Sequence, residues 1–147
     1  SNNEKMNDIK VNFIGRINLF PKDVHDAMID LMNKTKDNKP FIINFAMAYG
    51  GRQEITDAVK RIAQNIKNGR IKVEDIDENL IAENLYLKNE PDLVIRPSGE
   101  KRISNFLIWQ SAYSELVFID KLWPEFTKKD LVKCIEDFNK RERRFGK

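Results

Sequence analysis

The sequence predicts an α/β fold with a mainly parallel sheet flanked by helices. Segments of strand type and of helix type alternate along the chain, which is the order that such a fold requires. Residues 41–48 are apolar except for one Asn, and runs of this kind are typical of strands buried on both faces of a parallel sheet. The length of 147 residues predicts a single domain.

The first strand and the first helix precede this apolar run. Residues 9–14 alternate apolar with polar side chains, which predicts a strand with one buried face. A helix is expected to begin near Pro21, since proline suits the first turn of a helix. Apolar residues then recur at helical spacing, and the helix should end before Asn38.

A turn at residues 49–52 leads from the second strand into a second long helix. That helix is expected to end at Gly69, because glycine favours helix C-termini. Its buried stripe should consist of the apolar residues at helical spacing, which are Ile55, Val59, Ile62, Ala63 and Ile66. A short third helix should follow, with Asp77 as its N-cap.

The second half of the chain continues the alternation. Residues 92–95 and 115–119 are short apolar segments of strand type, and residues 106–113 between them have the pattern of a helix. Residues 127–130 resemble a capping box at the start of a last helix. The residues expected inside that helix are Leu131, Cys134, Ile135 and Phe138.

The composition is that of a soluble globular protein, with 41% hydrophobic and 33% charged residues. No apolar run approaches the ~18 residues of a membrane-spanning helix, and the first residues carry no apolar secretion signal. The single cysteine, Cys134, excludes an internal disulfide and a cysteine-cluster metal site. We therefore expect a cytoplasmic protein in which Cys134 is a small core residue.

The net charge of +3 is unevenly placed. Residues 140–147 hold five basic side chains and one acidic one, so the rest of the chain carries a net charge of −1. This is a basic tail rather than a basic protein, and we expect no nucleic-acid partner.

The densest polar cluster is the loop at residues 96–104, which follows a predicted strand. Ligands of open α/β sheets bind beyond the carboxyl ends of the strands, where the turn at residues 49–52 also lies. Arg96, Arg102 and Ser104 offer donors that suit phosphate oxygens, and Gly99 would let the backbone approach an anion. A helix starting after Ser104 would add its N-terminal amides. These features indicate a phosphate or diphosphate site; the alternative is a solvated loop.

Glu115 lies in an otherwise apolar stretch, where a carboxylate needs a partner. That partner could be Mg²⁺ beside a diphosphate or an Arg side chain in an ion pair, and the residues alone favour the Arg.

Several segments, taken in order, resemble the cis-prenyltransferases, the undecaprenyl diphosphate synthase family. Residues 44–52 are similar to its Asn…Tyr-Gly-Gly-Arg segment, and residues 92–107 to its Arg-x-x-Gly-Glu-x-Arg-x-Ser signature. Residues 109–124 continue the resemblance, and residues 141–146 match its C-terminal Arg-x-Gly motif. The resemblance runs from residue 9 to residue 146.

This resemblance implies an enzyme that adds isopentenyl diphosphate to an allylic diphosphate, forming cis double bonds. The products are long polyprenyl diphosphates, the precursors of glycan carrier lipids. By the same resemblance, Arg96, Arg102 and Ser104 would grip isopentenyl diphosphate, and Glu115 would help to hold Mg²⁺ on it.

The resemblance also implies a homodimer, because the family works as dimers. Arg144 and Gly146 would then reach the active site of the partner subunit. The apolar run at residues 41–48 would line the tunnel for the growing chain, and the protein would associate transiently with the membrane surface.

Three features depart from the family pattern. Pro97 stands where Thr is usual, and Lys101 stands where some members have His. The family's N-terminal Met-Asp-Gly-Asn-x-x-Trp block, which carries the catalytic Asp, is absent. We therefore expect residues 1–147 to be the C-terminal part of a single cis-prenyltransferase domain, incomplete at the N-terminus.

Such a chain contains no catalytic residue of its own, and we expect it to be inactive alone and to expose an apolar sheet edge. Two alternatives remain open. One is a non-catalytic subunit of a heteromeric cis-prenyltransferase, and the other is a small phosphate-binding α/β module.

Overall fold

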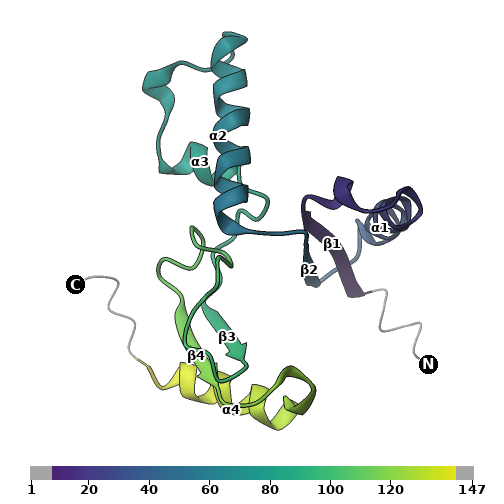
Figure 1. The fold of residues 1–147 in the computed structure, drawn as a ribbon, viewed down its shortest axis with the longest axis vertical. Coiled ribbons are helices and arrows are strands. Elements are labelled where there is room, and N and C mark those ends of the chain that lie inside the picture. Colours follow the sequence, from purple (N-terminus) through teal and green to yellow (C-terminus); the bar gives the residue numbers. More distant parts are fainter. Residues whose placement is uncertain (1–7, 142–147) are drawn as a thin grey trace.

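A computed structural model describes residues 8–141 of the chain (Figure 1). The helices and strands, in chain order, are β1 (Ile9–Gly15), α1 (Lys22–Thr35), β2 (Phe41–Met47), α2 (Gly51–Lys67), α3 (Glu78–Glu83), β3 (Leu93–Pro97), β4 (Glu115–Ile119) and α4 (Lys128–Asn139). Figure 1 shows three arms, β1–α1–β2, α2–α3 and β3–β4–α4, which meet near the first turn of α2.

The predicted α/β class with parallel strands is confirmed. β1 pairs in parallel with β2, from Ile9 opposite Phe41 to Gly15 opposite Met47. β3 pairs in parallel with β4 in the same way, although within the described residues the two pairs form separate sheets. Helices lie beside both pairs, with α1 against β1 and α4 beside β3 and β4.

The helix ends follow local signals that the sequence carries. The Asp77 carboxylate accepts a hydrogen bond from the Leu80 backbone N–H at 2.7 Å, which confirms the predicted N-cap of α3. At the start of α4, Thr127 and Asp130 form the expected reciprocal capping box. Gly69 follows α2 with a φ of +67°, a left-handed conformation that glycine adopts without cost.

The predicted burial of β2 on both faces is wrong within the described residues. Phe41 is 63% exposed, and Ile42, Ile43 and Phe45 are exposed as well. The reason is that β2 pairs with β1 alone, so no described strand closes its other edge. The apolar run therefore presents an open face.

Two helical stripes also differ from expectation. On α2 the buried residues are Gly51, Glu54, Ala58 and Ile62. Of the predicted stripe only Ile62 is therefore fully buried, and Glu54, which carries a carboxylate, is buried as well. On α4, Cys134 is buried as predicted, whereas Leu131 and Ile135 are exposed. Among the described residues, no helix is both long and apolar enough to cross a membrane.

Residues 106–113 are not the helix that their pattern predicts. They form a series of turns, because Ser104, Asn105 and Leu107 all have positive φ angles, which a continuous α-helix does not allow. No helix begins directly after Ser104. The expected contribution of helix N-terminal amides to an anion site is therefore absent at residues 104–113.

Candidate functional site

The side chain of Arg96 organises the loop at the carboxyl end of β3. Its Nη1 donates to Ser104 Oγ at 2.7 Å and also to the backbone carbonyl of Arg102. Its Nε donates to Ser98 Oγ at 3.3 Å. The loop at residues 98–104 therefore folds back over Arg96, and the structure brings together the three residues expected to bind diphosphate.

The Arg102 side chain pairs with Glu100 of the same loop. Its Nη1 lies 2.6 Å from Glu100 Oε2, and its side chain is 61% exposed. Exposed ion pairs of this kind contribute little to stability, so the guanidinium group can exchange Glu100 for another anion at small cost. One loop and the strand end before it thus supply two guanidinium groups and the Ser104 hydroxyl. These are donors of the kind that bind diphosphate oxygens.

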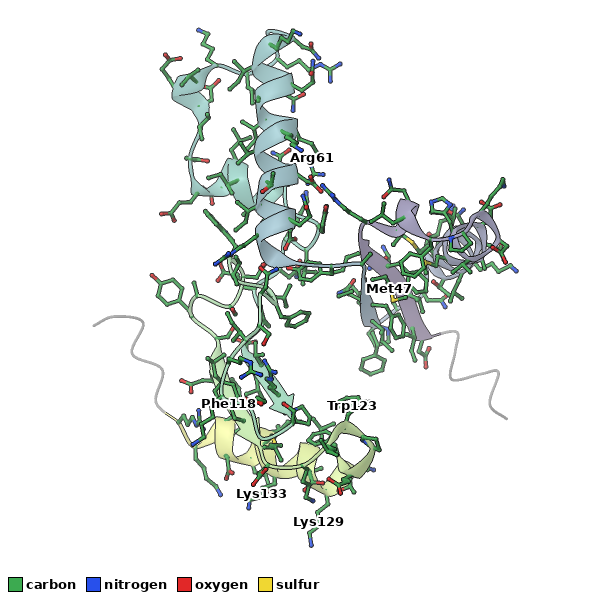
Figure 2. All side chains as sticks on the ribbon, viewed as in Figure 1. Met47, Arg61, Phe118, Trp123, Lys129 and Lys133 are labelled. Atoms are coloured by element: carbon green, nitrogen blue, oxygen red, sulfur yellow. The ribbon has the colours of Figure 1, made fainter. Side chains whose placement is uncertain are left out.

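A pocket of about 270 Å³ opens beside these donors. Val94 and Arg96 lie on one face of β3, opposite Leu116 and Phe118 of β4 in the parallel register. The pocket is lined by Arg96, Arg102 and Ser104 and by apolar side chains that include Val94, Ile95, Phe106, Leu116 and Phe118. Figure 2 labels Phe118, one of these apolar lining residues, on β4. The pocket combines cationic donors with an apolar wall, and so fits a ligand with an anionic head and a short hydrocarbon group.

Glu115 lies apart from this pocket. It is the first residue of β4 and pairs with Leu93, whereas Arg96 pairs with Phe118, about 10 Å further along β4. Glu115 Oε2 accepts a hydrogen bond from Arg141 Nη1 at 2.6 Å. The partner of Glu115 is therefore an Arg, the choice that the residues alone favoured.

The Glu115 carboxylate, the predicted magnesium ligand, is held by Arg141 in the described structure. Mg²⁺ in proteins is held by one or two carboxylates together with phosphate oxygens. Glu115 would supply one such carboxylate on release from Arg141, and residues 8–141 contain no group of three or more His, Cys, Asp or Glu side chains that would hold the ion without phosphate oxygens. Arg144 and Gly146, the other predicted site residues, lie outside the described part of the chain.

Gly99 does not offer its backbone to an anion, contrary to the sequence-based expectation. Its N–H donates to the Ile119 carbonyl at 3.0 Å. A Cβ at this position, with a φ of +73°, would lie 2.7 Å from Asp120 Oδ1. The positive φ favours glycine here, and a larger residue would also displace the Asp120 carboxylate.

The turn at residues 49–52 meets the Arg96 loop through Asn105. The N–H of Gly51 donates to the Asn105 carbonyl at 2.7 Å, and the N–H of Arg52 donates to Asn105 Oδ1 at 2.8 Å. Asn105 thereby caps α2 from a distant part of the chain, and its φ of +64° is one that Asn tolerates better than most residues. Sequence reasoning missed this residue; the paired glycines at positions 50 and 51 were the available signal.

A buried carboxyl group fixes the same region to α2. Glu54 is 1% exposed, and its Oε1 accepts hydrogen bonds from the backbone N–H groups of Tyr86 and Leu87 at 2.7 and 3.1 Å. Gln110 Nε2 donates to the same oxygen at 3.0 Å, and the Tyr49 hydroxyl donates to Oε2. Burial, together with this hydrogen bond, raises the pKa of the Tyr49 phenol.

A second polar cluster joins the end of β1 to α2. Arg16 holds Asp57 in a bidentate pair at 2.8 and 3.0 Å, and the Tyr86 hydroxyl also donates to Asp57. The hydrogen bond from Arg16, supported by the one from Tyr86, holds the pKa of Asp57 well below its usual value. This cluster ties the β1–α1–β2 arm to α2.

The chain matches, over residues 1–146, a family described as "Putative undecaprenyl diphosphate synthase". It is 53% identical over 144 residues to a "Tritrans,polycis-undecaprenyl-diphosphate synthase (geranylgeranyl-diphosphate specific)" from Methanocaldococcus jannaschii, which covers 95% of this chain and 51% of that protein. It is 50% identical over 147 residues to an "Isoprenyl transferase" from Streptococcus pyogenes, which covers 96% of this chain and 59% of that protein. The chain thus spans about half the length of the curated relatives it matches.

Solved structures agree with these sequence matches. Lavandulyl diphosphate synthase from Lavandula x intermedia, in complex with dimethylallyl diphosphate, is 35% identical with a TM-score of 0.92, covering 96% of this chain and 61% of that one. A "probable undecaprenyl diphosphate synthase" from Campylobacter jejuni is 34% identical with a TM-score of 0.85, covering 98% of this chain and 65% of that one.

Proposed function

The chain belongs to the undecaprenyl diphosphate synthase family of prenyltransferases, and on that premise we propose that it carries the isopentenyl diphosphate site of a cis-prenyltransferase. The proposed reaction joins isopentenyl diphosphate to an allylic diphosphate and yields long polyprenyl diphosphates. The observation that carries this proposal is the pocket in which Arg96 and Ser104 meet an apolar wall.

Each part of the pocket has a task in substrate binding. The guanidinium groups of Arg96 and Arg102 and the Ser104 hydroxyl donate to diphosphate oxygens. The isopentenyl group packs on Leu116 and Phe118. Arg96 is already held by Ser104 and by the Arg102 carbonyl, so little side-chain freedom is lost when the substrate binds.

The chemistry assigned to these residues is positioning. In the proposed reaction a carbon–carbon bond forms between the isopentenyl unit and the allylic carbon, the bond from that carbon to its diphosphate group breaks, and the isopentenyl unit loses a proton. Holding the isopentenyl double bond against the allylic carbon turns an encounter between two substrates into a reaction within one complex. The catalytic Asp of the family is proposed to lie outside this chain, so the chain alone is proposed to be inactive.

Further parts of the proposal concern cofactor, partner and location. We propose a homodimer in which Arg144 and Gly146 reach the partner's site, working in the cytoplasm in transient contact with the membrane surface. A magnesium ion would require Glu115 to leave Arg141, and no step of the mechanism is assigned to it.

Binding of isopentenyl diphosphate, measured by isothermal titration calorimetry at fixed ionic strength, tests the site. Arg96→Lys should weaken binding about 10- to 100-fold, because a hydrogen bond to a charged group is worth about 1.5–3 kcal/mol. Arg70→Lys, on an exposed residue outside the site, is the matched control. Inorganic pyrophosphate should bind more weakly than isopentenyl diphosphate, since it lacks the apolar group.

Equal affinities for the two ligands would favour a general phosphate-binding module over a prenyltransferase site. Unchanged binding by the Arg96→Lys variant would remove Arg96 from the site. Isopentenyl transfer by the purified 147-residue chain would overturn the proposal that it is inactive alone. An in-frame Met-Asp-Gly-Asn block upstream in the gene would favour a catalytic chain over a non-catalytic subunit.

A further inference from the structure

Asn105 connects the loop that carries the proposed diphosphate donors to the first turn of α2. Its carbonyl accepts from the Gly51 N–H and its Oδ1 accepts from the Arg52 N–H, at 2.7 and 2.8 Å. Gly50, the N-cap residue of α2, has no side chain that could make these bonds. The first two α2 amides are therefore engaged by a residue 54 and 53 positions further along the chain.

This contact limits the space at the two glycines that begin α2, the N-cap Gly50 and the first helical residue Gly51. A Cβ at Gly50 would lie 2.8 Å from Asn105 Nδ2. A Cβ at Gly51 would lie 2.7 Å from Ile108 Cγ1 and 3.1 Å from the Asn105 carbonyl oxygen. At Gly51 the nearby atoms include the backbone of Asn105 and Ile108, so the Asn105 segment and α2 fit together only with glycine there. At Gly50 a Cβ would displace the Asn105 side chain.

The backbone next to Asn105 is held in an unfavourable conformation. Ser104 and Asn105 have φ angles of +47° and +64°, in the left-handed region that residues other than glycine avoid. Consecutive residues in this region need outside support, and the two bonds to α2 supply it at Asn105. The same backbone places the Ser104 hydroxyl on Arg96.

We propose that Asn105 is a positioning residue, which sets Ser104 and Arg96 for the diphosphate by fixing their loop to the N-terminus of α2. This inference rests on the proposed function, because its effect is on isopentenyl diphosphate binding. Asn105 does not touch the ligand in this scheme; it acts through Ser104. A second attachment at Gln110, which donates to Glu54, holds the far end of the same segment. Loss of the Asn105 side chain should therefore act locally.

Three substitutions of Asn105 distinguish the effect of its Oδ1 hydrogen bond to α2 from the effect of its positive φ angle. Asn105→Ala removes the Oδ1 acceptor and disfavours the positive φ. Asn105→Gly removes the acceptor but suits the positive φ, so it should fold even if the alanine variant does not. Asn105→Asp retains an acceptor oxygen for the Arg52 N–H.

Dissociation constants for isopentenyl diphosphate, measured by calorimetry on the 147-residue chain, give the readout. We expect at least a tenfold increase for Asn105→Gly and Asn105→Ala, and recovery to within threefold for Asn105→Asp. Asn68→Ala, at the C-terminal end of α2, is the matched control for stability. It removes an exposed hydrogen bond from Gln64 and should leave the dissociation constant unchanged.

Ser104→Ala distinguishes failure of this inference from failure of the proposed site. If Ser104→Ala weakens binding and Asn105→Gly binds like the unchanged chain, the positioning role is refuted and the site stands. If Ser104→Ala and Arg96→Lys both leave binding unchanged, the proposed site itself is wrong and the inference falls with it.

Discussion

Glu54→Ala is predicted to destabilise the protein by about 3–5 kcal/mol, because it removes an acceptor from a buried network. Glu54 Oε1 accepts from the Tyr86 and Leu87 backbone N–H groups and from Gln110 Nε2. The site is buried, so water cannot readily replace the carboxyl group. Each donor left without an acceptor costs about 1–3 kcal/mol, and three such donors reach the predicted range.

The assay is urea unfolding followed by tryptophan fluorescence, with free energies of unfolding compared through their midpoints. Glu54→Gln keeps an oxygen for the three N–H donors and should cost only about 1 kcal/mol. Tyr49→Phe, which removes the hydrogen bond to Oε2, should cost a similar amount. The reasoning is refuted if Glu54→Ala and Glu54→Gln destabilise equally, because the donors would then find other partners. A loss of 3–5 kcal/mol is large against the about 5–15 kcal/mol that stabilises a typical protein.

Further predictions concern pH, a close contact and a helix cap. Because Arg16 lowers the pKa of Asp57, the stability from this pair is present above the unfolded pKa of about 3.9 and is lost as the pH falls towards the folded value. Urea midpoints should therefore fall less between pH 5 and pH 3 in Asp57→Asn than in the unchanged chain, and an equal fall would contradict the pairing. Gly51→Ala should cost about 1–3 kcal/mol in the same assay, and a neutral result would refute the predicted clash. Thr127→Ala should cost about 1 kcal/mol and lower the helical circular dichroism, since its Oγ1 accepts from the Asp130 N–H; unchanged stability would contradict the cap.

Features with a local cause could be predicted from the sequence. The N-cap at Asp77 and the capping box at residues 127–130 depend on atoms three residues apart, and both are confirmed. The four strands follow from short apolar segments whose positions the structure reproduces. The grouping of Arg96 with Ser104 was also accessible, because both belong to one loop.

Features that depend on distant partners could not be predicted. Glu54 is not part of the apolar stripe expected to be buried, yet it is buried by partners at Tyr86 and Gln110, which lie 32 and 56 residues further along the chain. Residues 106–113 have helical spacing, but the segment that begins at Ser104 contacts α2 through Asn105. Its positive φ angles at Ser104, Asn105 and Leu107 are ones that an α-helix does not permit. The burial of β2 was overestimated, since an apolar run does not reveal how many neighbouring strands cover it.

The contact between Asn105 and the paired glycines also has a consequence for the evolution of the sequence. Gly51 lacks space for a Cβ because of Ile108 and the Asn105 backbone, and a Cβ at Gly50 would displace the Asn105 side chain, so these positions do not vary independently of the Asn105 segment. A side chain at position 50 or 51 should be tolerated only in relatives whose segment around position 105 has moved or changed. Correlated substitution between positions 50 and 51 and positions 105 and 108, which are 54 to 58 residues apart, would record the same contact in a sequence alignment.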